Sequence, residues 1–183
     1  MTCGRLGSDL CDRCRAYLNT ASDRLLDGGL LVRSAFRHEG PARELVHQFK
    51  YRGSDRAGWM LASALARLIP DGAFVVPVPR SSWRHVRYGL DPAPDLARRL
   101  RVLIGCEVVS ALAAPALAHR QAGRKRSDRQ PPRLRVTSPS PAESVIIIDD
   151  VLTTGRTLNS AHLALRSAGI RVDSAITATA RGD

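Results

Sequence analysis

Two adjacent carboxylates followed by a hydroxyl-rich turn form the segment of this chain best suited to chemistry. Asp149 and Asp150 come directly after the apolar run 145–148, and the turn after them consists of Val151, Leu152, Thr153, Thr154, Gly155, Arg156 and Thr157. Threonine hydroxyls and the backbone N–H groups of a helix N-terminus favour a phosphate, and Gly155 lets the backbone approach it closely. Carboxylates repel phosphate, but they accept hydrogen bonds from a pair of ribose hydroxyls. The segment therefore predicts a sugar-phosphate site.

The same residues also have an interpretation without a ligand. The acidic pair can cap the turn, and the threonines can cap the helix that follows. The chain contains neither the Walker loop G-x-x-x-x-G-K-[ST] nor the dinucleotide fingerprint G-x-G-x-x-G. Phosphate sites of those two kinds are therefore excluded, and the surrounding elements must decide between the two interpretations.

The elements that position this segment predict an α/β fold. Residues 145–148 are wholly β-branched, which is typical of a strand buried on both faces of a parallel sheet. Further strands are expected at 30–36, 74–78, 106–109 and 170–180, and helices at 41–49, 56–69, 95–104 and 156–168. Strands that alternate with helices favour a parallel sheet, which binds ligands at the carboxyl ends of its strands.

Composition and charge limit the classes of protein and ligand. The 183 residues, 44% hydrophobic and 25% charged, fit one large domain and a small appendage, which we place at 30–183 and 1–29. No apolar run approaches the ~20 residues of a membrane span, and residues 1–15 carry no hydrophobic stretch typical of a signal peptide, so we expect a cytoplasmic protein without a membrane segment. The net charge of +11 favours a phosphorylated metabolite or nucleic acid, unless it reflects an arginine-rich composition bias.

Three of the four cysteines lie close together near the N-terminus. Cys3, Cys11 and Cys14 fall within the first fourteen residues, a spacing that indicates metal ligation rather than disulfides in a reducing compartment. Cys106 lies alone in an apolar run, and we expect it in the core.

The order of several motifs resembles the ComF family of the type I phosphoribosyltransferase superfamily. In chain order the motifs are the cysteine module, Phe49-Lys50-Tyr51-Arg52-Gly53, Val76-Pro77-Val78-Pro79, Gln121-Ala122-Gly123 and the run 145–157. The resemblance implies a Rossmann-like parallel sheet flanked by helices, and a site at 149–157 for 5-phosphoribosyl-1-pyrophosphate (PRPP) with Mg²⁺. It also implies transfer of the phosphoribosyl group to a nitrogenous acceptor with release of pyrophosphate, with Asp149 and Asp150 as the catalytic pair.

The resemblance also assigns roles to two basic loops and to the cysteines. Pyrophosphate would be held by Arg80, Arg84 and Arg87, and a lid over the substrate would carry Arg120, Arg124, Lys125 and Arg126. The alternatives are a solvated loop and a basic linker. Relatives hold zinc on two C-x-x-C pairs, so Cys3, Cys11 and Cys14 are the implied ligands. The fourth cysteine of the pattern would fall one residue ahead of Met1, so either the true start lies upstream or the site is reduced to three thiolates.

The sequence departs from the family near both loops. Tyr88-Gly89-Leu90-Asp91-Pro92 replaces the usual R-G-F-N-Q, and Pro131-Pro132 replaces the usual Arg and Asn. The competing hypothesis is therefore an accessory protein that binds PRPP or a nucleoside 5-monophosphate and joins DNA-processing proteins in competence. Single-stranded DNA binding by the arginine loops ranks lower, because only Trp83 and Tyr88 offer stacking surfaces there. The acceptor base and the oligomeric state stay open, a homodimer included.

Overall fold

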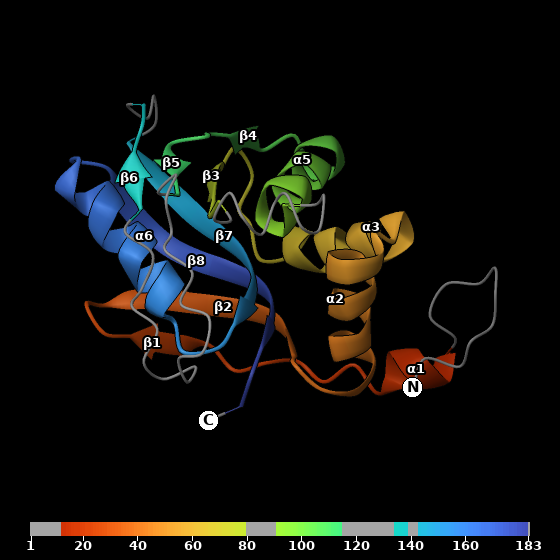
Figure 1. Cartoon of the computed structure of the whole chain (residues 1–183). Helices are drawn as coiled ribbons and strands as arrows, with labels where there is room; N and C mark the ends of the chain where they lie inside the picture. The colour runs from red at the N-terminus through yellow and green to blue at the C-terminus, as the bar shows by residue number, and fades with distance from the viewer. Residues whose placement is uncertain (1–11, 80–90, 115–133, 139–142, 183) are drawn as a thin grey trace.

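The computed structural model describes residues 12–79, 91–114, 134–138 and 143–182, and these form a mainly parallel sheet with helices on both faces (Figure 1). The six strands run in the order β1-β2-β8-β7-β3-β4, and only the β1–β2 pair is antiparallel. Their bounds are β1 Arg24–Leu26, β2 Leu30–Arg37, β3 Phe74–Pro77, β4 Glu107–Val108, β7 Ser144–Leu152 and β8 Arg171–Ala180. The predicted parallel α/β sheet is confirmed.

Helices pack on the two faces of β7 and β8 and divide the core into two clusters. The helices are α1 Asp12–Ala16, α2 Gly40–Arg52, α3 Asp55–Ala66, α5 Pro92–Ile104 and α6 Arg156–Ser167. Because successive strand residues point to opposite faces, Ile146 and Ile148 pack with α2, α3 and α5, whereas Val145 and Ile147 pack with α6. The two β-branched pairs are thus buried on opposite faces, as a central parallel strand requires.

Several boundaries differ from the sequence prediction for identifiable reasons. Helix α5 begins at Pro92 rather than at residue 95, because proline is tolerated in the first helical turn. Helix α3 ends at Ala66, short of residue 69. Strand β7 continues through Leu152, since its pairing with β8 extends to Leu152 and Ala180. Asp149 and Asp150 consequently lie within the strand and not after it.

Four short elements were not expected from the sequence. They are α1, β1 and a separate two-stranded pair, β5 Leu112–Ala113 and β6 Arg135–Val136. Strand β1 pairs with β2 at the edge of the main sheet, although residues 24–26 fall in the segment assigned to the N-terminal module. The division of the chain at residue 29 stays a prediction. Among the helices that the structure describes, none is long and apolar enough to cross a membrane.

Candidate functional site

The two aspartates at the end of β7 have different surroundings. Asp150 lies on the face covered by α2, where its Oδ2 contacts Nζ of Lys50, and only 7% of Asp150 is exposed. Asp149 is partly buried, and its Oδ1 accepts a hydrogen bond of 2.8 Å from the backbone N–H of Asp150. The pair is therefore asymmetric: one carboxylate is held by a cation and the other is not.

This asymmetry has an electrostatic consequence for Asp149. Burial, with the neighbouring charge of Asp150 as the second cause, raises the pKa of Asp149 from 3.8 to about 8. Lys50 acts in the opposite direction on the same pKa. Two adjacent carboxyl groups cannot both ionise cheaply, so we expect Asp149 to hold a proton near neutral pH when no ligand is bound.

The raised pKa of Asp149 predicts a pH dependence of stability. An unfolded aspartate loses its proton near pH 4, whereas folded Asp149 keeps it up to about pH 8. The contribution of protonated Asp149 to the free energy of unfolding is complete below pH 4 and is lost as the pH rises through 8. The stability of the wild type should therefore fall between pH 5 and pH 8. Asp149→Asn cannot titrate, and in urea unfolding it should lose less stability over this range by about 1 kcal/mol or more. Equal losses in the two proteins would contradict the assignment.

The turn between β7 and α6 presents an open helix N-terminus. Gly155 is the N-cap residue of α6, with φ 72°, and as a glycine it has no side chain to cap the helix. Thr153 and Thr154 precede it and are exposed. The N-cap position that the capping interpretation gives to a threonine is therefore held by Gly155. The first N–H groups of α6 and the exposed hydroxyls together form the donor set that a phosphate requires.

Strand β1 supports this turn from the other side of the chain. Arg24 donates through Nη1 to the carbonyl of Thr153 (3.4 Å) and through Nη2 to the carbonyl of Arg181 (2.8 Å). A Cβ atom at Gly155 would lie 2.6 Å from Cδ1 of Leu26. This contact could not be predicted from the sequence, because Arg24 and Thr153 are 129 positions apart.

The close approach at Gly155 predicts a specific stability defect. Gly155→Ala places a Cβ in the left-handed region, which costs about 1–2 kcal/mol, and also against the Leu26 methyl groups. In Gly155→Ala, Leu26→Ala the contact is relieved but the backbone strain stays. Urea unfolding should show a smaller effect of Gly155→Ala in the Leu26→Ala background than in wild type. Additive losses would show that Leu26 does not constrain the turn.

A histidine and a threonine lie next to the aspartates at the carboxyl ends of β2 and β8. His38 follows β2, and its Nδ1 is 2.8 Å from Oγ1 of Thr179, which is fully buried. The backbone N–H of His38 donates to the carbonyl of Ala180 (2.6 Å). Burial lowers the pKa of His38, and the positive charges of Arg181 and Arg43 lower it further. Sequence reasoning missed His38, and it assigned no role to Lys50 although Lys50 belongs to a quoted motif.

Most of the other predicted site residues lie outside the described residues. This holds for Arg80, Arg84, Arg87, Arg120, Arg124, Lys125, Arg126, Cys3 and Cys11. Cys14 is buried, and within the described ranges no group of three or more His, Cys, Asp or Glu side chains could hold a metal. The zinc site stays a prediction. Cys106 is 1% exposed in the core, as expected.

Comparison with known proteins finds a matching family and several curated relatives of this chain. Residues 53–183 match the family described as Phosphoribosyl transferase domain. The DNA utilization protein YhgH of Salmonella typhi is 30% identical over 152 residues, covering 72% of this chain and 64% of the relative. YhgH of Escherichia coli (strain K12) has the same identity and coverage. The chain thus spans 64% of the length of these curated relatives.

Two phosphoribosyltransferases of known structure show a weak similarity to this chain. Orotate phosphoribosyltransferase from Aeropyrum pernix is 19% identical, with a TM-score of 0.38, and the alignment covers 90% of this chain and 76% of that chain. Adenine phosphoribosyltransferase from Leishmania tarentolae is 13% identical, with a TM-score of 0.47, and coverage is 85% and 80%. The resemblance inferred from the motifs is confirmed by the family match and the YhgH relatives. This chain belongs to the phosphoribosyl transferase domain family.

Proposed function

We propose that this protein binds PRPP at the end of β7 and transfers its phosphoribosyl group to a nitrogenous acceptor. The observation that carries the proposal is the N-terminus of α6 with Gly155 at the N-cap, preceded by exposed Thr153 and Thr154 and lying just beyond the Asp149–Asp150 pair. In a 5-phosphoribosyl group the phosphate is attached to the ribose itself. One such group could therefore place its phosphate at the turn and its ring hydroxyls at the aspartates. The family match supports this assignment.

The roles of the residues follow from their chemistry. The 5-phosphate would accept hydrogen bonds from the turn 153–157, and the two ribose hydroxyls would donate to Asp149 and Asp150. The acceptor nitrogen uses its lone pair to form a bond to C1 while the bond from C1 to the pyrophosphate oxygen breaks, and pyrophosphate leaves with that electron pair. The proton on the nitrogen is then released. Catalysis consists mainly of holding the sugar in line for this displacement.

Magnesium fits the donor set at the end of β7. Mg²⁺ prefers oxygen ligands and is commonly held by one or two carboxylates together with substrate phosphates, and Asp149 and Asp150 are carboxylates next to the phosphate turn. When bound with PRPP, the ion would neutralise charge on the leaving pyrophosphate. We also propose zinc on Cys3, Cys11 and Cys14, which metal analysis of the purified protein would test.

Ligand-induced stabilisation tests the binding step. PRPP with MgCl₂ at 100 times its Kd should raise the free energy of unfolding by about 2.7 kcal/mol. Ribose 5-phosphate should stabilise less, because it lacks the pyrophosphate, and inorganic phosphate less again. No stabilisation by PRPP would overturn the proposal. Pyrophosphate release in the presence of a panel of bases then separates an enzyme from a protein that only binds PRPP.

The second candidate is an accessory role in handling DNA. The observations that favour it are the printed name of the YhgH relatives, DNA utilization protein, and the net charge of +11. In this role the protein would bind PRPP or a nucleotide without turnover, and it would associate with DNA-processing proteins or with single-stranded DNA.

The arginines that follow β3 distinguish a pyrophosphate loop from a DNA surface. Replacing Arg80, Arg84 and Arg87 with alanine should weaken PRPP far more than a nucleoside monophosphate, since only PRPP carries pyrophosphate at C1. Each charge-assisted hydrogen bond lost should cost about 1.5–3 kcal/mol. Binding should be titrated at two salt concentrations for PRPP and for single-stranded DNA. A triple variant that keeps its PRPP affinity, but loses DNA and flattens the salt dependence, would assign the loop to DNA instead.

A further inference from the structure

The topology determines the side from which an acceptor reaches the sugar. Strand β7 carries the proposed PRPP site, and its neighbours are β3 on one side and β8, then β2, on the other. The proposed pyrophosphate loop follows β3. In an in-line displacement the attacking atom and the leaving group lie on opposite sides of C1. If the proposed function holds, the acceptor therefore lies toward the carboxyl ends of β8 and β2.

Hydrogen bonds hold the backbone of this acceptor side in one place. The backbone N–H of Arg181, just after β8, donates to the carbonyl of Leu152 at 2.9 Å, which fixes Arg181 beside the phosphate turn. His38 is fixed to β8 by its bonds to Ala180 and Thr179. Arg24 holds the carbonyl of Arg181 from the other side. His38 and Arg181, which directly follow β2 and β8, are thus positioned by the sheet itself.

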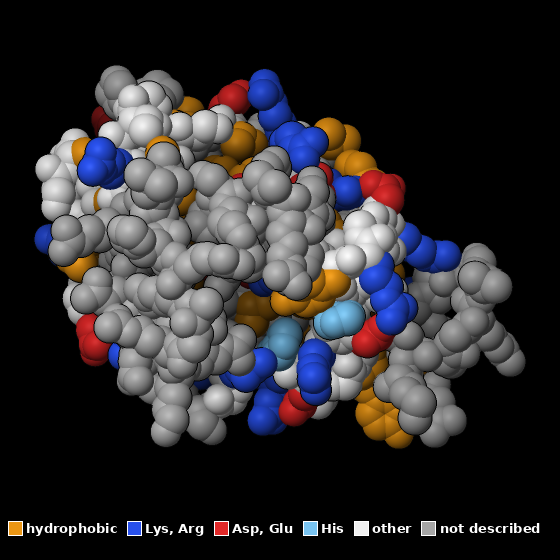
Figure 2. Space-filling model, viewed as in Figure 1, with side chains coloured by type: hydrophobic (Ala, Val, Ile, Leu, Met, Phe, Trp, Pro, Cys, Tyr) orange, Lys and Arg blue, Asp and Glu red, His pale blue; other side chains and the backbone are white. Residues whose placement is uncertain are grey.

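The charges on this acceptor side are mainly positive. Three positive charges lower the pKa of His38: Arg43 in the first turn of α2, Lys50 and Arg181. The negative charge of Asp150 raises it. Asp150 is already paired with Lys50. Arg43 and Arg181 are exposed. The backbone N–H of Arg43 donates to the carbonyl of Glu39 at 3.2 Å, which places Arg43 one helical turn from His38, and Arg181 directly follows Ala180, the residue to which His38 is bonded. Figure 2 shows Lys and Arg side chains near the histidine side chains on the face in view, together with hydrophobic and a few Asp and Glu side chains.

We propose that the acceptor of this site carries an acidic group, recognised by Arg43 and Arg181 next to His38. The turn 153–157 accounts for the 5-phosphate, and Lys50 for Asp150, whereas a carboxylate or phosphate on the acceptor would give Arg43 and Arg181 charge-assisted hydrogen bonds of their own. His38 supplies a further polar contact. The inference rests on the proposed function and names the class of its acceptor.

Matched mononucleotides that differ by one negative charge test this inference. Nicotinate and nicotinamide mononucleotide have the same shape, and the first carries a carboxylate where the second carries an amide. Titration calorimetry should find nicotinate mononucleotide bound at least about tenfold more tightly. Orotidine and uridine 5-monophosphate form a second pair that differs by a carboxylate, and the same direction is expected.

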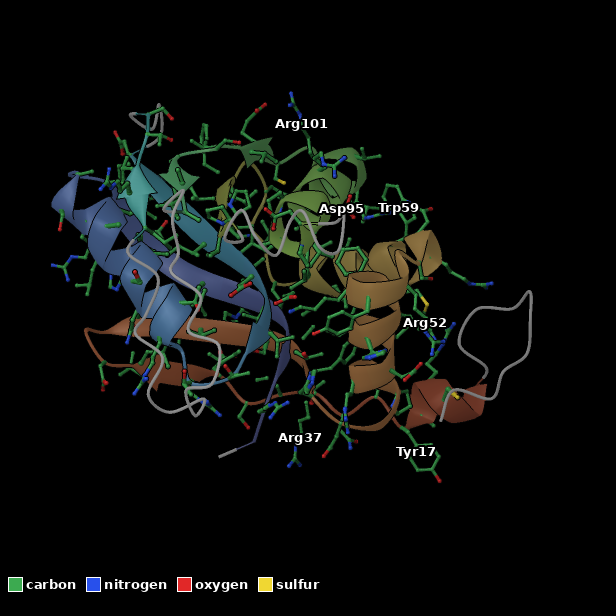
Figure 3. All side chains as sticks on the ribbon, viewed as in Figure 1. Tyr17, Arg37, Arg52, Trp59, Asp95 and Arg101 are labelled. Carbon is green, nitrogen blue, oxygen red and sulfur yellow. The ribbon has the colours of Figure 1, made fainter. Side chains whose placement is uncertain are left out.

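Variants and the titration of His38 show whether Arg43 and Arg181 recognise the negative charge of the ligand's carboxylate. Arg43→Met with Arg181→Met should reduce the preference to less than about threefold. Arg52→Met, on the side of α2 away from the sheet (Figure 3), should leave it unchanged. By NMR, assigned with His38→Gln, nicotinate mononucleotide should raise the pKa of His38, and nicotinamide mononucleotide should not.

The possible outcomes separate this inference from the proposed function. If both members of each pair bind equally, the acidic acceptor is wrong while the mononucleotide site stands. A preference that survives in the double Arg43, Arg181 variant also overturns it, because other residues would then read the charge. If PRPP stabilises the protein but no mononucleotide binds, the acceptor side is wrongly placed. If neither PRPP nor a mononucleotide binds, the proposed function fails as well.

Discussion

Replacing both Asp149 and Asp150 with asparagine should abolish the stabilisation of this protein by PRPP. At 100 times Kd the wild type should gain about 2.7 kcal/mol in free energy of unfolding, and the double variant close to none. The reason is that an amide keeps the size of a carboxyl group but cannot ionise, whereas Asp149 can release its proton when the ribose hydroxyls and Mg²⁺ bind to the pair. The measurement is the shift in urea midpoint on adding PRPP and MgCl₂.

The shift must be read against each variant's own stability without ligand, because Asp150→Asn also removes the partner of Lys50. Asp173→Asn is a suitable control. Asp173 is an exposed carboxylate near the start of β8, where its Oδ2 accepts a hydrogen bond from the hydroxyl of Ser144, at the amino end of β7. It should leave the PRPP effect intact. A double Asp149, Asp150 variant stabilised as much as wild type would remove the aspartates from the site.

The parts of the fold that the sequence predicted are those set by local pattern. The run 145–148 is β-branched throughout, which favours a central strand buried on both faces. Ile147 and Ile148 are indeed fully buried. Gly155 and the threonines before it likewise located the turn and the start of α6 within one residue. Local composition is sufficient for such elements because neighbouring residues determine them.

The parts that the sequence could not predict depend on distant contacts. Extension of β7 through Leu152 follows from its pairing with β8, and the support of the turn by Arg24 and Leu26 follows from the position of β1. Asp149 and Asp150 were treated as an equivalent pair, yet the carboxylate of Asp150 is paired with Lys50 of α2. A partner so distant in the chain leaves no local pattern, so the different surroundings of the two carboxyl groups could not be predicted from the sequence.

The contact between Lys50 and Asp150 joins residues 100 positions apart and is the clearest of these distant effects. We expect Lys50→Met to destabilise the protein by about 2–4 kcal/mol, at or just below the range for breaking a buried ion pair. The side chains of Lys50 and Asp150 are 21% and 10% exposed, so solvent screens the pair only partly. Without Lys50, the charge of Asp150 stays buried next to a second carboxyl group.

Asp150→Asn should cost less, because the freed lysine can turn its flexible side chain toward water and the repulsion with Asp149 disappears. In the double variant Lys50→Met, Asp150→Asn no buried charge is left alone. A double-mutant cycle by urea unfolding should therefore give a coupling energy of about 1–3 kcal/mol. Arg52→Met, two residues further along α2 and exposed, is the control and should change stability by less than about 0.5 kcal/mol.

The same cycle tests the electrostatics of the site itself. Because Lys50 lowers the pKa of Asp149, Lys50→Met should raise that pKa further and shift the loss of stability to higher pH. Asp150→Asn should lower it, because the second-largest cause of the raised pKa is removed. Opposite shifts in the two variants would show that α2 controls the protonation of the ribose-binding pair through Lys50. Additive stability losses without any change in the pH profile would mean that Lys50 only packs against the end of the sheet.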